Sequence, residues 1–151
     1  MQYPVSVGAA YVLDTDVMVA ALRSDRGASR QLLLAALNRQ FELLLSVPLM
    51  LEYEAVLTRP QHLAASGLSS ADVGRVLDDL ATVARPVRLA FRWRPLLSDS
   101  NDDMVLETGI NGGARAIVTF NRRDFADAGR SFHCAALLPA AALQQIRRSI
   151  L

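Results

Sequence analysis

The sequence predicts an α/β fold in which helices cover both faces of a mainly parallel sheet. Short apolar runs alternate along the chain with longer segments of helical spacing, as at 5–13 followed by 15–22. A strand that is buried on both faces reads as a continuous apolar run. Alternation of such strands with helices is typical of parallel strands joined by helical crossovers.

The first half of the chain contains two predicted strands and three predicted helices. Thr15 or Asp16 is expected to cap the first helix, and Pro48 suits the first turn of the third. Arg59-Pro60 is expected to end that third helix. In chain order, the elements are a strand over 5–13, helices over 15–22 and 29–39, a strand over 41–46 and a helix over 48–57.

The second half continues the alternation. Ser69 and Asp72 have the spacing of a capping box, which predicts that a helix begins there. Gly112-Gly113 is a helix stop, and Pro139 is expected to begin a terminal helix. The predicted elements are a helix to Ala84, a strand over 86–90, a helix over 101–111, strands at 116–119 and 137–138, and the terminal helix.

Length and composition point to one compact domain spanning 1–151. The chain has 151 residues, 52% of them hydrophobic, which is enough to bury a core. No apolar run approaches the roughly 20 residues that a membrane span needs, and the N-terminus lacks the basic region of a signal peptide. The single cysteine, Cys134, excludes an internal disulfide and suits a reducing compartment. We therefore expect a cytoplasmic protein without membrane contact.

All sixteen basic residues are arginine. This bias has two interpretations, a GC-rich genome or selection for the planar fork that binds phosphate. Arg85, Arg88, Arg92 and Arg94 also interleave with Phe91 and Trp93. Such a stripe is typical of nucleic-acid binding by charge and stacking, and equally of a strand edge with a packed tryptophan.

Acidic and amide side chains recur where predicted strands end or helices begin. Asp14 ends the first strand, Glu52 lies in the segment after the second, and Asp102 begins a later helix. Asn121 and Asp124 follow the strand at 116–119. These positions converge at one edge of a parallel sheet. Such a cluster would be repulsive unless a divalent cation neutralised it, which predicts a Mg²⁺- or Mn²⁺-dependent nuclease site.

Several of these residues also have a purely structural interpretation. Asp14 fits either a ligand or a helix cap, and the spacing does not distinguish Glu52 from Glu54. Asn121 fits a helix cap, with Asp124 in the first turn of that helix.

The acidic residues at 99–103 also have both a ligand and a structural interpretation. It begins like a calcium-binding loop, but Met104 replaces the glycine and Ile110 the glutamate that this loop requires. Ser100 and Asp103 match a capping box, whereas Asp102 would lie in the first helical turn and is the preferred ligand. Glu107, about one turn further along, is expected on the same side.

The segments WRPLLSDSNDDMVLE and AIVTFNRRDF resemble the PIN-domain family, in the VapC-like branch described as toxins of bacterial toxin–antitoxin systems. VLDTDV, SVPLMLEYEAVLTRP and LLPAAAL match as well, so the resemblance covers nearly the whole chain in order. It implies a three-layer α/β/α sandwich on a parallel sheet, with acids at its carboxyl edge that bind Mg²⁺ or Mn²⁺ for RNA cleavage.

The resemblance also assigns site residues. Asp14 matches the first acid, Glu52 rather than Glu54 the second, and Asp102 the third, with Asp103 beside it. The last position falls on Asn121, often aspartate in the wider family, with Asp124 close behind. The resemblance further implies a cognate antitoxin and a homodimer. A catalytically weak module that binds RNA or protein is the alternative, because Asn121 replaces an acid.

Overall fold

The computed structural model describes residues 8–89, 100–131 and 134–150, without the side chains of 100–103 and 127–131. Its centre is a five-stranded sheet with the order β3-β2-β1-β4-β5. Every neighbouring pair is parallel. The predicted parallel sheet is thereby confirmed. The strands are β1 (Ala10–Leu13), β2 (Glu42–Leu45), β3 (Arg85–Pro86), β4 (Ala116–Val118) and β5 (Ala135–Leu137).

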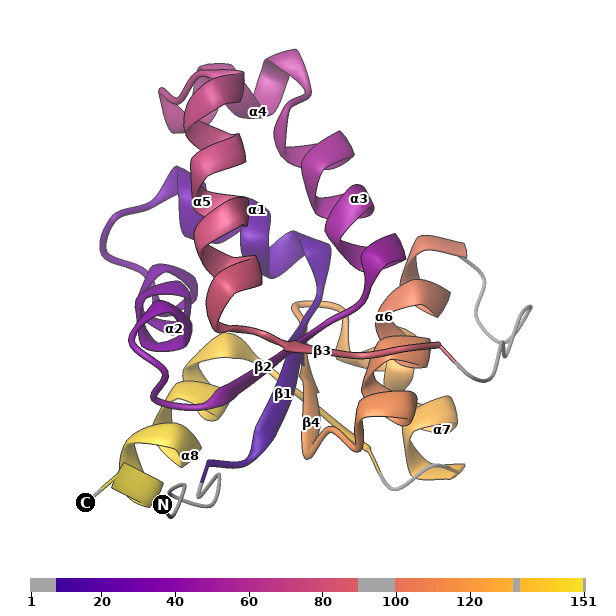
Figure 1. Cartoon of the computed structure of the whole chain (residues 1–151). Helices are drawn as coiled ribbons and strands as arrows, with labels where there is room; N and C mark the ends of the chain where they lie inside the picture. The colour runs from indigo at the N-terminus through magenta and orange to yellow at the C-terminus, as the bar shows by residue number, and fades with distance from the viewer. Residues whose placement is uncertain (1–7, 90–99, 132–133, 151) are drawn as a thin grey trace, which may run out of the picture.

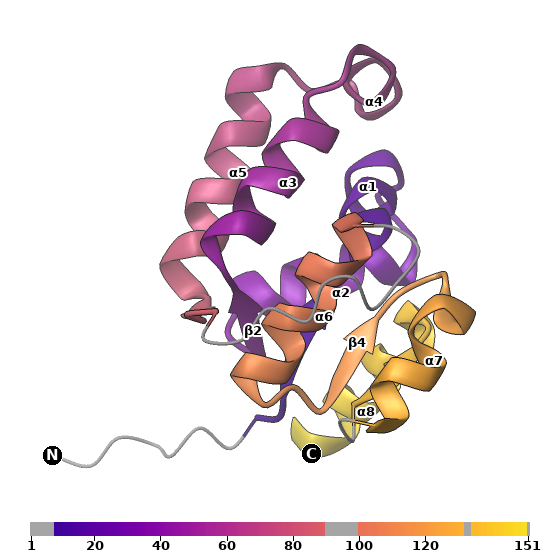
Figure 2. The same ribbon diagram turned by 90° about the vertical axis from the view of Figure 1, so that its right-hand side faces the viewer.

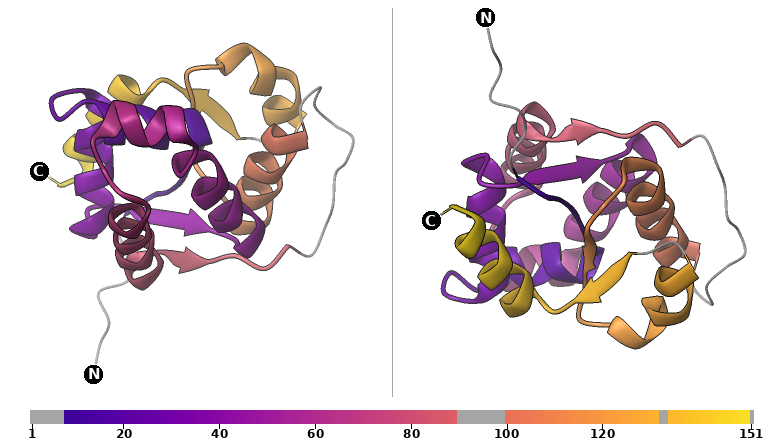
Figure 3. Two further views of the ribbon diagram at one scale, coloured as in Figure 1. Left: turned by 90° about the horizontal axis from the view of Figure 1, so that it is seen from above. Right: turned by 90° about the horizontal axis from the view of Figure 1, so that it is seen from below.

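Helices cover both faces of this sheet, as a three-layer α/β/α arrangement requires. One face carries α6 and α7 (Figure 2), and on the other α2 packs against α8 (Figure 3). α3, α4 and α5 project from the sheet as an arm (Figure 1). The helices are α1 (Thr15–Arg23), α2 (Ala28–Leu37), α3 (Val47–Leu57), α4 (Pro60–Ser66), α5 (Ser70–Val83), α6 (Ser100–Gly112), α7 (Arg122–Ser131) and α8 (Pro139–Ile150).

Local signals begin several helices where the sequence predicts. Ser46 Oγ accepts from the N–H of Leu49, which caps α3 ahead of Pro48. At α5 the capping box is complete, because Ser69 and Asp72 each accept from the other's backbone N–H. Pro60 does more than end α3. It occupies the first turn of α4, a position where its missing N–H leaves no hydrogen bond unmade.

Two glycines let α6 lie close against the sheet. A Cβ placed on Gly109 would lie 3.3 Å from Val12 Cγ1, in β1. One placed on Gly112 would lie 2.7 Å from Leu44 Cδ1 and 2.9 Å from Val87 Cγ2. Larger residues would push the helix outward, so these positions set the depth at which α6 packs.

The structure describes the single cysteine and the hydrophobicity of the helices. Cys134 is buried, and burial raises the pKa of its thiol to about 11. Within the described ranges, every helix is too short or too polar to reach across a bilayer.

The arginine and aromatic stripe is described only at its start. Arg85 pairs with Glu42 (Nε to Oε1, 2.8 Å) and donates to the carbonyl of Gly112 (2.6 Å). Arg85 therefore joins β3 to β2 and to the end of α6. This structural role agrees with the interpretation of the stripe as a strand edge. Phe91, Arg92, Trp93 and Arg94 lie outside the described residues.

Candidate active site

The strand order reverses direction beside β1. β2 follows β1 in the chain on one side, whereas β4, on the other side, comes after β3. In an open parallel sheet, ligands bind at such a reversal, in the crevice outside the carboxyl ends of the two strands. Asp14 directly follows β1 and Thr119 directly follows β4. The topology therefore places these two residues where a binding site is expected.

Asp14 is 4% exposed, and both carboxylate oxygens accept hydrogen bonds. Oδ1 accepts from the backbone N–H of Thr15 (2.8 Å), and Oδ2 from the hydroxyl of Thr119 (2.7 Å). Asp14 is thus the N-cap of α1, and the expectation that Thr15 or Asp16 caps this helix is wrong. The chain enters α1 with Asp14 still extended, which brings its carboxylate to the first helical N–H. Because a carboxylate offers about four lone-pair sites, capping leaves it free to bind a cation.

The environment of Asp14 disfavours its negative charge. Burial, and after it the charge of Asp16, raise the pKa of Asp14 from 3.8 to about 7. The hydrogen bonds from Thr119 and Thr15 lower that pKa and only partly oppose the increase. The Oγ1 atom of Thr15 is buried and has no hydrogen-bond partner among the residues that the structure describes. A hydroxyl can both donate and accept a hydrogen bond, so this group can bind a water molecule or a ligand at the site.

Asp16 connects α1 to the segment after β4. Its Oδ2 accepts from the backbone N–H of Phe120 (3.2 Å). The hydroxyl of Thr119, besides donating to Asp14, accepts from the N–H of Asn121 (2.9 Å). Residues 119–121 are thus held against two carboxylates. The sequence predicts only a capping role for Asp16 and does not single out Thr119. A polar residue at the tip of a buried strand is the signal that identifies both Thr119 and Asp14.

The structure separates Glu52 from Glu54. Both lie on α3, but Glu52 is half-buried and Glu54 exposed. The neighbouring Tyr53 is fully buried and donates its hydroxyl to the carbonyl of Leu13 (2.5 Å), which fastens α3 to the end of β1. Burial, and then the charge of Asp14, raise the pKa of Tyr53 well above its ordinary value. The helix that carries Glu52 thus lies against the Asp14 site.

We expect Tyr53→Phe to lower the free energy of unfolding by about 1–3 kcal/mol, because a buried hydroxyl bond is lost without a change in shape. Urea denaturation measures this loss. Tyr11→Phe is the matched control, since that hydroxyl donates to Gln145 in a partly buried position and should cost less. Equal losses in the two variants would contradict a special role for Tyr53 at the end of β1.

For the remaining predicted ligands, the structure gives only the position in the fold or the exposure. Asp102 and Asp103 lie in the first turn of α6, but their side chains, like all of Asp99, lie outside the described atoms. Glu107, one turn on, is 1% exposed. Asn121 and Asp124 are exposed at the start of α7, where the N–H of Asp124 donates to the carbonyl of Asn121 (3.1 Å). This backbone forms the first helical turn that is expected if Asn121 caps α7 and Asp124 lies in its first turn.

The described side chains alone do not complete a metal site. They bring Asp14 and Asp16 together, but contain no cluster of three or more His, Cys, Asp or Glu residues that could hold an ion. Asp99 and the side chains of Asp102 and Asp103 lie outside the described atoms. A third ligand from the start of α6 therefore stays a prediction.

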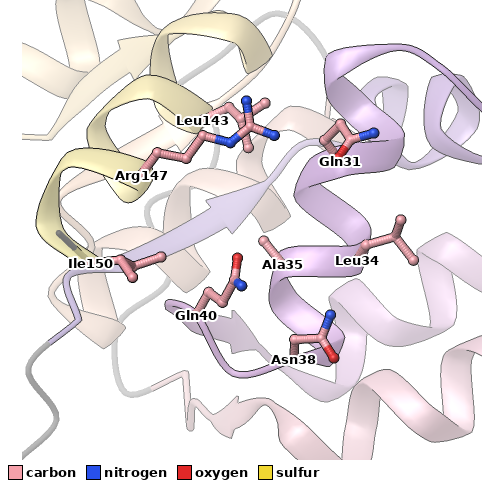
Figure 4. A pocket seen from close by; sticks show the side chains of 8 residues that line it. All are labelled: Gln31, Leu34, Ala35, Asn38, Gln40, Leu143, Arg147 and Ile150. Carbon is pink, nitrogen blue, oxygen red and sulfur yellow. The ribbon is translucent and has the colours of Figure 1, made fainter.

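A separate cavity of about 570 Å³ lies between α2 and α8 (Figure 4). It opens at the amino end of β2, which Gln40 precedes, and so lies at the opposite edge of the sheet from Asp14. Its lining is mixed, with Gln31, Leu34, Ala35, Asn38, Gln40, Leu143, Arg147 and Ile150. It plays no part in the candidate site.

A family model described as PIN domain matches residues 10–123. The chain belongs to the PIN-domain family. The match begins at β1, contains Asp14, Glu52 and Asp102, and ends one residue before Asp124. Among curated proteins, no sequence matches the chain. PIN domains are generally nucleases that use divalent metals, so the family indicates a nuclease-type fold and a nucleic-acid substrate.

Proposed function

We propose that this PIN domain is a Mg²⁺- or Mn²⁺-dependent endoribonuclease and the toxin of a toxin–antitoxin pair. The observation that carries the proposal is the pair Asp14 and Asp16, held at the strand-order reversal of a nuclease-type fold. The charge of Asp16 raises the pKa of Asp14, and a divalent cation would relieve the repulsion between the two carboxylates.

The residues present fit a hard divalent cation. Carboxylate oxygens are the ligands that Mg²⁺ prefers, usually one or two of them with water. The buried hydroxyl of Thr15, which has no partner among the described residues, would suit a water molecule of such a hydration shell. We assign the ion to Asp14, Glu52 and Asp102, with Asp103 and Asp124 in support and Asn121 positioning water.

A bound divalent ion would lower the pKa of water and stabilise charge on the phosphate. The chain's own residues would prepare that chemistry. Thr119 and the N–H of Thr15 hold the Asp14 carboxylate in one orientation. Asp16 holds the 119–121 segment at the edge of the site. Arg122 and Arg123, both exposed just beyond it, would attract the phosphate backbone.

The toxin assignment, the antitoxin and the homodimer follow from the resemblance to the toxin branch. Exposed apolar side chains on α3 are in keeping with a protein partner, since Val47 is 73% and Leu51 59% exposed. Both are on the helix that carries Glu52. A partner bound there would lie beside the site.

Calorimetric titration of Mn²⁺, followed by a cleavage assay with single-stranded RNA, tests the function. We expect the wild-type protein to bind Mn²⁺ and to cut RNA internally, and EDTA to abolish cleavage. Matched DNA and a phosphomonoester distinguish a DNA nuclease or phosphatase. Cleavage that continues in EDTA would contradict the proposal.

The same experiment separates the alternative, a module that binds RNA or protein without turnover. The exposed amide of Asn121 favours it, because the family often has an acid there. Metal-independent RNA affinity without products would establish the binding module.

A further inference from the structure

One aromatic side chain is exposed at the candidate site. Phe120 is 50% exposed. The other aromatic residues whose side chains the structure describes are all buried, at 5% exposure or less: Tyr11, Phe41, Tyr53 and Phe125. A phenyl ring left in water lacks the favourable free energy of burial that every other described aromatic ring gains on folding. Phe120 is therefore available to a ligand.

The backbone around Phe120 is fixed to the two site carboxylates. Its own N–H donates to Asp16 Oδ2 (3.2 Å). The preceding Thr119 donates to Asp14, and the following Asn121 donates back to Thr119 (2.9 Å). Consecutive Cα atoms are about 3.8 Å apart, so the ring is attached one residue from the group that touches Asp14. The backbone that carries the ring is therefore held in place at the edge of the site.

We propose that Phe120 is a base-stacking residue that holds one nucleobase of single-stranded RNA beside the scissile phosphate. The inference rests on the proposed function and adds a residue that positions the substrate. A nucleotide whose phosphate lies at Asp14 would present its base within one side chain's reach of Thr119. Aromatic rings bind unpaired bases by stacking, whereas the bases of a duplex already stack on one another.

Charge at the same place complements this substrate. Arg122 and Arg123 follow Phe120 closely and are both exposed. A basic segment next to an aromatic ring is the arrangement by which proteins bind single strands, with arginines on phosphates and the ring on a base. Every base can stack on an aromatic ring. Phe120 therefore selects single-stranded over double-stranded RNA more than it selects a particular base sequence.

The test measures RNA binding by fluorescence anisotropy in EDTA, and steady-state cleavage with Mn²⁺. We expect Phe120→Ala to weaken binding of a labelled single-stranded oligonucleotide and to raise KM by about 5- to 100-fold, with kcat changed much less. Phe120→Trp should retain affinity, whereas Phe120→Leu, still apolar, should lose most of it. An oligonucleotide lacking one base at the stacked position should bind wild type and Phe120→Ala alike.

Controls separate stacking from a structural effect. Mn²⁺ affinity and the thermal midpoint should be unchanged in the Phe120 variants, because the backbone bond to Asp16 remains. Leu34→Ala removes a side chain of similar exposure, 45%, on α2, and should change neither RNA binding nor KM.

The outcomes distinguish this inference from the function beneath it. If wild type cuts RNA and Phe120→Ala or Phe120→Leu binds and cuts equally well, the stacking role is wrong and the nuclease stands. Loss of a protein partner, with RNA affinity intact, would assign the ring to a protein interface and overturn the inference. If wild type neither binds nor cuts RNA, the proposed function fails, and the stacking role with it.

Discussion

Asp14→Asn is expected to lower RNA cleavage at least about a thousandfold and, in the absence of metal, to make the protein more stable. The loss of activity follows because the variant lacks the buried charge assigned to the cation, whose charge stabilisation is worth several kcal/mol. The gain in stability follows from the pKa of Asp14, which rises from 3.8 to about 7 on folding.

The direction of the pH dependence is fixed by that increase. Between about pH 4 and pH 7, the folded protein holds a proton on Asp14 that the unfolded chain releases. The free energy of unfolding therefore falls as pH rises through this range, and the full cost is present above about pH 7. Asparagine carries no charge and caps a helix as well as aspartate does, so it removes the cost and keeps the cap. We expect a gain of about 2–4 kcal/mol at pH 8 and little gain at pH 4.

Urea denaturation in EDTA at both pH values measures this gain, and Mn²⁺ titration with the cleavage assay measures the loss. Asp72→Asn is a control of opposite sign, because the backbone bond from Ser69 lowers the pKa of that capping-box carboxyl. It should reduce stability at pH 8, and less so at low pH. Cleavage by Asp14→Asn at the wild-type rate would show that Asp14 is not a metal ligand. A loss of stability in this variant at pH 8 would contradict the conclusion that the folded protein disfavours the ionised Asp14 carboxylate.

Thr119→Val is expected to reduce stability by about 2–4 kcal/mol and Mn²⁺ affinity by about 10- to 100-fold. The substitution keeps the shape but removes the donor to Asp14 Oδ2 and the acceptor for the N–H of Asn121. Because the Thr119 bond lowers the pKa of Asp14, its loss raises that pKa further. The destabilisation should therefore be larger at pH 8, where Asp14 is ionised, than at pH 5.

Thr108→Val is the matched control. Thr108 is as buried as Thr119, and its hydroxyl bonds Ser46 Oγ (2.7 Å) and the carbonyl of Met104 (2.8 Å). Its loss should lower stability to a similar degree at pH 5 and pH 8 and leave Mn²⁺ affinity intact. If Thr119→Val behaved in the same pH-independent way, Thr119 would be a core residue and not a positioning residue for Asp14.

Local chemistry made much of the fold predictable. The continuous apolar runs before Asp14 and Ser46 indicate strands buried on both faces, and they become β1 and β2. The capping box at Ser69 and Asp72 and the proline at 48 begin helices through contacts within one turn of chain. Such signals need no distant partner, so they can be read from the sequence. The alternation of these elements was then sufficient to predict a parallel sheet.

The sequence by itself also determined that acids follow the strands, with Asp14 foremost. Only the tertiary structure decided how they are used. Thr119 meets Asp14 across 105 residues, a contact that depends on β4 lying beside β1. Glu52 is distinguished from Glu54 by the face that α3 turns toward the core. Periodicity reports which residues share a face within one element, whereas strand order decides which elements meet, and that order arises from packing of the whole chain.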